Sequence, residues 1–84
     1  MNLDSARIQI NEIDKEIVLY LEKRFDLAMQ IGKYKKENNL PVYDEEREKN
    51  VIENCINFLN NKEYAKYIED IYNQIMESSK ELQQ

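Results

Sequence analysis

Five polar residues fall on faces of the chain where helical spacing would place apolar ones. Arg24 and Lys35 are eleven residues apart, about three helical turns, so both project from nearly the same side of a helix. Glu48 falls on a second apolar line, and Ser79 and Gln83 extend a third. Unpaired buried charges are expensive, so these residues need partners. Two cations, one carboxylate and neutral donors together suit a small anionic molecule that carries a hydroxyl group.

Each of these residues also has an explanation that involves no ligand. A single polar residue at a core position of a heptad commonly fixes the register of a coiled coil, and Arg24 fits that description. The neighbouring Leu21 and Ala28 are apolar, which widens the apolar face and favours a packed bundle instead. Lys35 alone could be a solvated lysine near a helix end, and Glu48 alone an ordinary ion-pair partner. Ser79 could be a small packing residue, and Gln83 part of a frayed terminus. From the residues alone, a ligand site and a structural polar network both remain open.

The composition excludes several kinds of chemistry. The chain has no histidine and a single cysteine, Cys55, so it offers no Cys/His zinc site, no histidine-based triad and no internal disulfide. A net charge of -5 argues against nucleic-acid binding, which needs a basic face. No stretch approaches the roughly 18 apolar residues of a membrane span, and the start does not resemble a signal peptide. We therefore expect a cytoplasmic protein that contacts neither nucleic acid nor membrane.

One long helix and two shorter ones must position the polar residues. The chain of 84 residues has one glycine and one proline and is rich in helix formers, which predicts an all-α fold in a single domain, residues 1–84. Residues 4–37 contain no proline, and their apolar residues recur at spacings of three and four, which predicts a helix of about 50 Å. Its apolar line consists of Leu3, Ala6, Ile10, Ile13, Ile17, Tyr20, Leu27, Ile31 and Tyr34.

Turn residues separate the two shorter helices. Pro41 ends the first helix, and Asp44 suits the N-terminus of the second. The apolar line of this second helix is Val51, Ile52, Cys55, Ile56 and Leu59. The sequence Asn-Asn-Lys at 60–62 breaks it, and a third helix is predicted from about Glu63 to the end. The predicted inner face of the third helix carries Tyr64, Ile68, Ile71, Tyr72, Ile75 and Met76.

The length of the first helix and its glycine predict two kinds of close packing. Two short helices cannot cover the whole apolar line of so long a helix, so we expect a second copy of the chain to cover the rest in a homodimer. Gly32 costs the helix about 1 kcal/mol relative to alanine. We therefore expect a neighbouring backbone or a ligand to approach closely at Gly32.

Several short motifs occur in a fixed order along the chain: Arg7-x6-Asp14, Lys23-Arg24, Ile31-Gly32-Lys33-x-Lys35, Pro41-Val42-x-Asp44-x2-Arg47-Glu48 and Ser79-x3-Gln83. Together they resemble the all-helical chorismate mutases over nearly the whole chain. The resemblance implies an intertwined homodimeric bundle with two equivalent sites. It also implies that the substrate is the dianion chorismate, which rearranges within the molecule to prephenate on the route to phenylalanine and tyrosine.

The resemblance further implies how the substrate carboxylates are bound. Arg24 would bind one of them. Arg7 would reach the other from the partner subunit, because it lies about 100° around the helix from Arg24 and cannot share its face.

The remaining roles concern the ether oxygen and the ring hydroxyl. Lys35 and Gln83 would donate hydrogen bonds to the ether oxygen of the breaking C–O bond, with Gln84 as the alternative to Gln83. Glu48, with the backbone near Asp44, would hold the ring hydroxyl. The lining would be completed by Arg47 and Ser79.

A pericyclic rearrangement needs no nucleophile, proton shuttle or metal, so no cofactor is expected. The site has to hold the enolpyruvyl arm over the ring and to meet the negative charge that grows on the ether oxygen. Two other functions stay open. A lyase of the same fold that removes pyruvate from isochorismate would use almost the same charged residues, and a non-catalytic helical dimer would not depend on Lys35 for any activity.

Overall fold

The computed structural model describes residues 1–84 and consists of three α-helices and one 3-10 turn. The elements are α1 (Leu3–Glu37), α2 (Glu45–Phe58), η1 (Lys62–Tyr64) and α3 (Ala65–Gln83). The prediction of an all-α fold is therefore confirmed, and so is the prediction of one long helix followed by two shorter ones. The predicted start of the third helix was wrong, because residues 62–64 form the 3-10 turn and the α-helix begins at Ala65. No helix is both long and apolar enough to cross a membrane.

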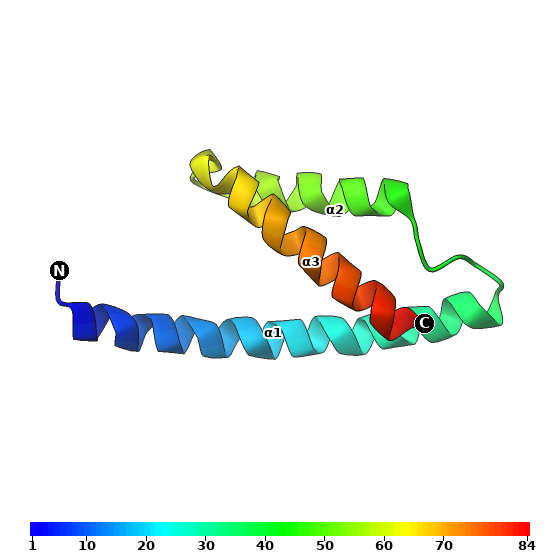
Figure 1. Ribbon diagram of the computed structural model, residues 1–84, viewed down its shortest axis with the longest axis horizontal. Coiled ribbons are helices and arrows are strands. Elements are labelled where there is room, and N and C mark those ends of the chain that lie inside the picture. The colour runs from blue at the N-terminus through cyan, green and yellow to red at the C-terminus, as the bar shows by residue number, and fades with distance from the viewer.

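Helix α3 lies between the other two helices (Figure 1). It crosses α1 obliquely, and its C-terminal end lies against the C-terminal half of α1, whereas α2 packs mainly on α3. The N-terminal half of α1 extends beyond both shorter helices. The chain is consequently elongated, with extents of 54, 24 and 15 Å.

Side chains in the connecting segments cap both ends of α2. The carboxylate of Asp44 accepts a hydrogen bond from the backbone N–H of Arg47 at 3.0 Å, which fixes the first turn. At the other end, the ammonium of Lys62 donates to the carbonyl oxygens of Ile56 and Asn57 at 2.8 and 2.9 Å. A cation at a helix C-terminus satisfies free carbonyls and interacts favourably with the helix dipole. The Asp44 cap thus lies where α2 begins, and the Lys62 contacts satisfy two carbonyl groups of its last turn.

A single chain has a very small core. Only five of its 84 residues are buried: Ala28, Gly32, Val51, Met76 and Ser79. The apolar line predicted for the second helix is confirmed, since Val51 is buried and the other four members are half-buried. Tyr64 and Ile71, which were predicted to lie on the inner face of the third helix, are each 55 % exposed in the single chain. Tyr64 belongs to the 3-10 turn, and Ile71 lies about 140° around the helix from Met76.

Gly32 allows the end of α3 to lie directly against α1. A Cβ atom added to Gly32 would lie 2.6 Å from the Cα of Gln83 and 2.9 Å from its carbonyl oxygen. These are backbone atoms, so no change of side-chain rotamer relieves the overlap. The expected close approach of a neighbouring backbone at Gly32 is confirmed.

We expect Gly32→Ala to destabilise the protein. Helix propensity favours alanine by about 1 kcal/mol, but overpacking against a helix backbone costs about 1–3 kcal/mol. The net effect is a free energy of unfolding lowered by about 1 kcal/mol, the middle of the range of roughly 0–2 kcal/mol that these two figures leave, measured by urea denaturation followed by circular dichroism. The exposed neighbour Lys33 provides the control variant Lys33→Ala, which should not lower stability. Equal or greater stability of Gly32→Ala would contradict the tight contact with Gln83.

Candidate active site

A cavity of about 340 Å³ lies between the C-terminal half of α1, the start of α2 and the end of α3. Its volume is in the range of small-molecule sites. The structure brings seven of the eight predicted site residues to its walls: Arg24, Lys35, Asp44, Arg47, Glu48, Ser79 and Gln83. Between the two α1 cations, Ala28 and Ile31 form part of the apolar lining.

Arg7 is the one predicted site residue that does not line the cavity. It lies near the start of α1, about 25 Å along the helix axis from Arg24. No rotamer of a single side chain spans that distance, so Arg7 cannot reach the cavity of its own chain. Its predicted contribution to the site of a partner subunit stays a prediction.

Arg24 is held in place by α3 without a carboxylate. Its guanidinium donates to the hydroxyl of Ser79 at 3.1 Å, and this hydroxyl in turn donates to the carbonyl of Ile75 at 2.7 Å. The guanidinium carbon also lies 5.8 Å from the centre of the Tyr72 ring, within range of a cation–π interaction. Burial and the neighbouring thiol of Cys55 raise the pKa of Tyr72, so the phenol stays neutral. Arg24 is thus oriented while its charge remains available to an anion.

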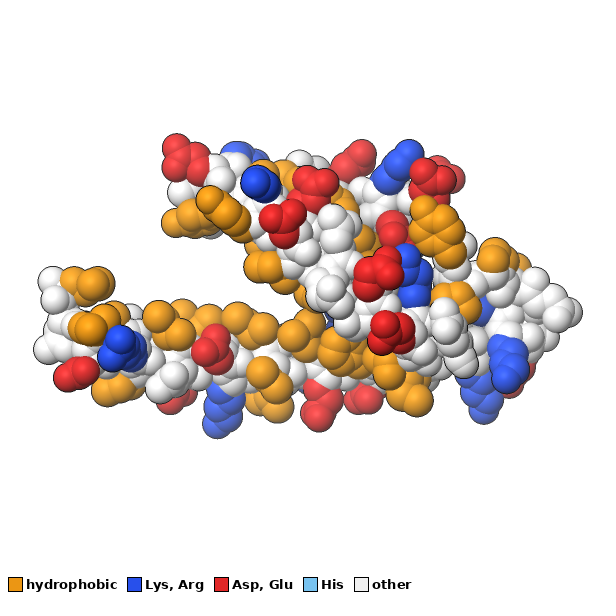
Figure 2. Space-filling model, viewed as in Figure 1, with side chains coloured by type: hydrophobic (Ala, Val, Ile, Leu, Met, Phe, Trp, Pro, Cys, Tyr) orange, Lys and Arg blue, Asp and Glu red, His pale blue; other side chains and the backbone are white.

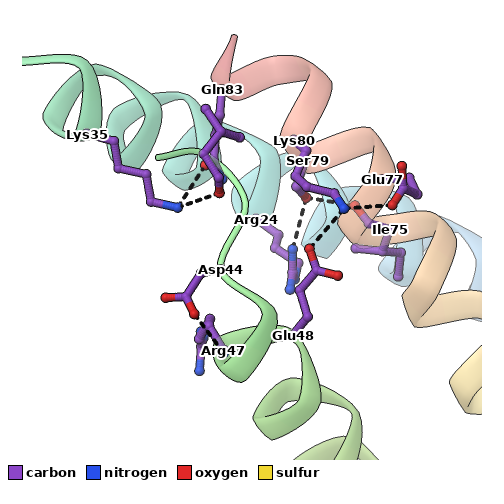
Figure 3. A network of polar contacts seen from close by, with 11 residues as sticks. Arg24, Lys35, Asp44, Arg47, Glu48, Ile75, Glu77, Ser79, Lys80 and Gln83 are labelled. Atoms are coloured by element: carbon purple, nitrogen blue, oxygen red, sulfur yellow. Dashed lines mark hydrogen bonds and ion pairs between the residues drawn. The ribbon is translucent and has the colours of Figure 1, made fainter. Parts of the chain in front are cut away.

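Lys35 joins α1 to the loop before α2 and to the end of α3 (Figure 3). Its ammonium donates to the carbonyl of Val42 at 2.9 Å and to Oε1 of Gln83 at 3.3 Å. An ammonium has three donors, so one is left for a ligand. Gln83 lines the cavity and Gln84 does not, while the choice between them as the hydrogen-bond donor stays a prediction.

Glu48 pairs with a lysine that the sequence analysis did not identify. The ammonium of Lys80, on α3, lies 3.0 Å from Oε2 of Glu48 and 2.7 Å from Oε1 of Glu77 (Figure 3). Lys80 also lines the cavity. The available signal was its spacing of four residues from Met76, which places both on one face of α3.

Cations outnumber carboxylates in the lining. The four cationic side chains are Arg24, Lys35, Arg47 and Lys80, and the two carboxylates are Asp44 and Glu48. Of the cations, only Lys80 has a carboxylate within 4.0 Å. In a protein of net charge -5, this local excess of positive charge favours a small ligand with more than one negative charge. No cluster of three or more Cys, Asp or Glu side chains is arranged to hold a metal ion.

The fold and cavity define a small helical protein with a cationic site between its helices. Residues 6–84 match the family chorismate mutase type II. A conserved hypothetical protein from Pyrococcus furiosus has a similar solved structure, with a TM-score of 0.82, 36% sequence identity, and coverage of 98% of this chain and 95% of that one. This chain belongs to the type II chorismate mutase family.

The similar curated proteins are longer than this chain. A bifunctional chorismate mutase/prephenate dehydratase of Buchnera aphidicola subsp. Schizaphis graminum is 40% identical over 79 residues, which are 93% of this chain and 20% of that protein. A T-protein of Haemophilus influenzae is 39% identical over 46 residues, 55% of this chain and 12% of that protein. The chain therefore spans about a fifth or less of the length of these relatives.

Proposed function

We propose that this protein is a chorismate mutase, an isomerase that converts chorismate to prephenate in the biosynthesis of phenylalanine and tyrosine. The observation that carries the proposal is a cavity of small-molecule size in which Arg24, Lys35 and Arg47 have no carboxylate partner. Chorismate is a dianion, so it supplies the missing negative charge. Membership of the type II chorismate mutase family supports the same substrate.

The proposed mechanism is restriction of the substrate followed by electrostatic stabilisation. Arg24 binds one carboxylate, and the cavity walls hold the enolpyruvyl arm over the ring in the reactive conformation. Lys35 and the amide of Gln83 then donate to the ether oxygen, where negative charge grows as the C–O bond breaks. The contact between these two side chains uses the oxygen of the Gln83 amide and leaves its NH2 group for the ligand. Effects worth about 8 kcal/mol suffice for an enzyme at the modest end of rate enhancements.

The other lining residues bind the opposite end of the substrate. Glu48 accepts a hydrogen bond from the ring hydroxyl, supported by the backbone near Asp44. The Asp44 carboxylate itself caps α2 and thereby fixes the turn that carries Glu48. Ser79 orients Arg24 through its hydroxyl, and Arg47 adds positive charge at the rim.

We also propose that the protein is a homodimer in which Arg7 completes the site of the partner. The support is the exposed apolar face of α1: Ile10, Ile13 and Ile17 are 53%, 54% and 49% exposed in one chain. Figure 2 shows apolar side chains along the part of α1 that extends beyond the other helices. Extended exposed apolar surface marks a protein interface. The single domain over residues 1–84 and the cytoplasmic location remain predictions.

The rate should be nearly independent of pH around neutrality, because the amide of Gln83 does not titrate. Gln83→Glu should make kcat fall as the pH rises, since a carboxyl group donates only when protonated and an ordinary glutamate has a pKa of about 4.3. The pH profile of kcat measures this difference. Gln74→Glu, an exposed change on the same helix, should keep the parental profile. A flat profile for Gln83→Glu would contradict the donor role.

The proposal is tested by incubating the purified protein with chorismate. The ultraviolet absorbance of chorismate should decrease, and nuclear magnetic resonance should identify prephenate as the product. If the folded protein leaves chorismate unchanged, the mutase proposal is wrong. Isochorismate is then the next substrate, because release of pyruvate would identify a lyase.

A further inference from the structure

Lys80 has the most complete set of partners of any charged side chain in the cavity. Its ammonium makes ion pairs with Glu48 at 3.0 Å and Glu77 at 2.7 Å, and it lies 4.8 Å from the centre of the Tyr43 ring. The Lys80 side chain is only 20% exposed. Residues from the loop before α2, from α2 and from α3 therefore fix one ammonium beside the carboxylate of Glu48 (Figure 3).

Glu48 needs such a partner because of the other charges around it. Arg24, Lys35 and Arg47 line the same cavity, and none of them has a carboxylate within 4.0 Å. Without Lys80, these cations would attract the Glu48 carboxylate across the cavity. A pair between Glu48 and Arg24 would neutralise the cation that binds the substrate and would remove the acceptor for its hydroxyl group.

We propose that Lys80 is a positioning residue that holds Glu48 away from the substrate-binding cations and aims it at the hydroxyl-bearing end of the substrate. This inference rests on the proposed mutase function. A carboxylate offers about four acceptor positions, so Glu48 binds Lys80 and still accepts from a hydroxyl. Lys80 thereby contributes to selection of a substrate that carries both a hydroxyl group and carboxylates.

The contacts of Lys80 also keep it charged. Hydrogen bonds from Lys80 to Glu77 and then to Glu48 raise the pKa of Lys80, so the ammonium stays protonated around neutral pH. Glu77 is 63% exposed and lies on the outer side of Lys80 (Figure 3). It therefore anchors the ammonium without entering the cavity, since it is absent from the lining.

A double-mutant cycle on the full chain tests the inference. Lys80→Gln should raise KM for chorismate about tenfold, because the substrate must first displace Glu48 from the cations, and should lower kcat by less than about threefold. Lys80→Arg keeps the charge and should stay within about threefold of the parent in both constants. In a Glu48→Gln background, Lys80→Gln should add less than about a twofold effect on KM. Lys49→Gln, an exposed lysine paired with Glu45, is the matched control and should behave as the parent.

Each outcome decides the inference. If Lys80→Gln has the KM of the parent, the inference is wrong and the mutase function is unaffected. The inference is also wrong if Lys80→Gln raises KM as much in the Glu48→Gln background as it does in the parent. Loss of activity in Lys80→Arg as severe as in Lys80→Gln would also overturn it, provided that circular dichroism shows both variants folded. A parent without mutase activity would overturn the proposed function, and the inference with it.

Discussion

Lys35→Ala is expected to lower kcat for chorismate by about a hundredfold or more without unfolding the protein. Lys35 is the only cation in the cavity that is bound to both the loop before α2 and the end of α3, through Val42 and Gln83. These contacts hold its ammonium where we propose that the ether oxygen lies. A charge already in position costs no reorganisation during the reaction, and its removal therefore affects the transition state more than the bound substrate.

The measurement is a comparison of kcat and KM, with a neighbouring lysine as control. Lys36→Ala removes the same charge from the exposed side of the same helix turn and should retain parental activity. Lys35→Ala should mainly lower kcat. A higher KM with an unchanged kcat would mean that Lys35 only binds the substrate. Parental kcat in Lys35→Ala would contradict the proposed mechanism and would favour a helical dimer without catalytic function.

Most of the fold was predictable because local sequence determines it. The spacing of apolar residues defines α1 and α2, and the cap of Asp44 defines where α2 begins. The 3-10 turn before α3 was not predicted. Residues 62–64 are of types that also occur in α-helices, so their identity does not predict the turn. The turn depends on the side chain of Asn61, which accepts a hydrogen bond from the backbone N–H of Glu63 at 3.0 Å. Such a bond competes with the helix and is not apparent from periodicity.

The residues around the cavity were predictable where a polar type interrupts an apolar line. That signal identified Arg24, Lys35 and Glu48, which the structure brings together. It did not identify Lys80, because a lysine near the end of a charged helix resembles a solvated one. What distinguishes Lys80 is its contact with Tyr43 and Glu48, two residues more than thirty positions away, and such contacts exist only in the folded chain.

Mixing two inactive variants should restore activity if Arg7 serves the partner's site. Arg7→Ala and Arg24→Ala each remove one carboxylate-binding cation, so each homodimer should lose most of its turnover. In a dimer that contains one subunit of each kind, one site lacks both arginines and the other has both. Random reassortment after joint unfolding and refolding should therefore recover about a quarter of parental activity.

The controls separate complementation from refolding and from dimer formation. Each variant refolded alone should gain no activity. If one variant is labelled with nitrogen-15, native mass spectrometry should show the mixed dimer, because the two substitutions change the mass of the chain equally. No recovery in a preparation that contains mixed dimers would place Arg7 outside the partner's site. A monomer with full activity would overturn the dimer proposal altogether. That outcome is difficult to reconcile with the structure, because Arg7 lies about 25 Å from Arg24 along α1 and only five residues of the isolated chain are buried.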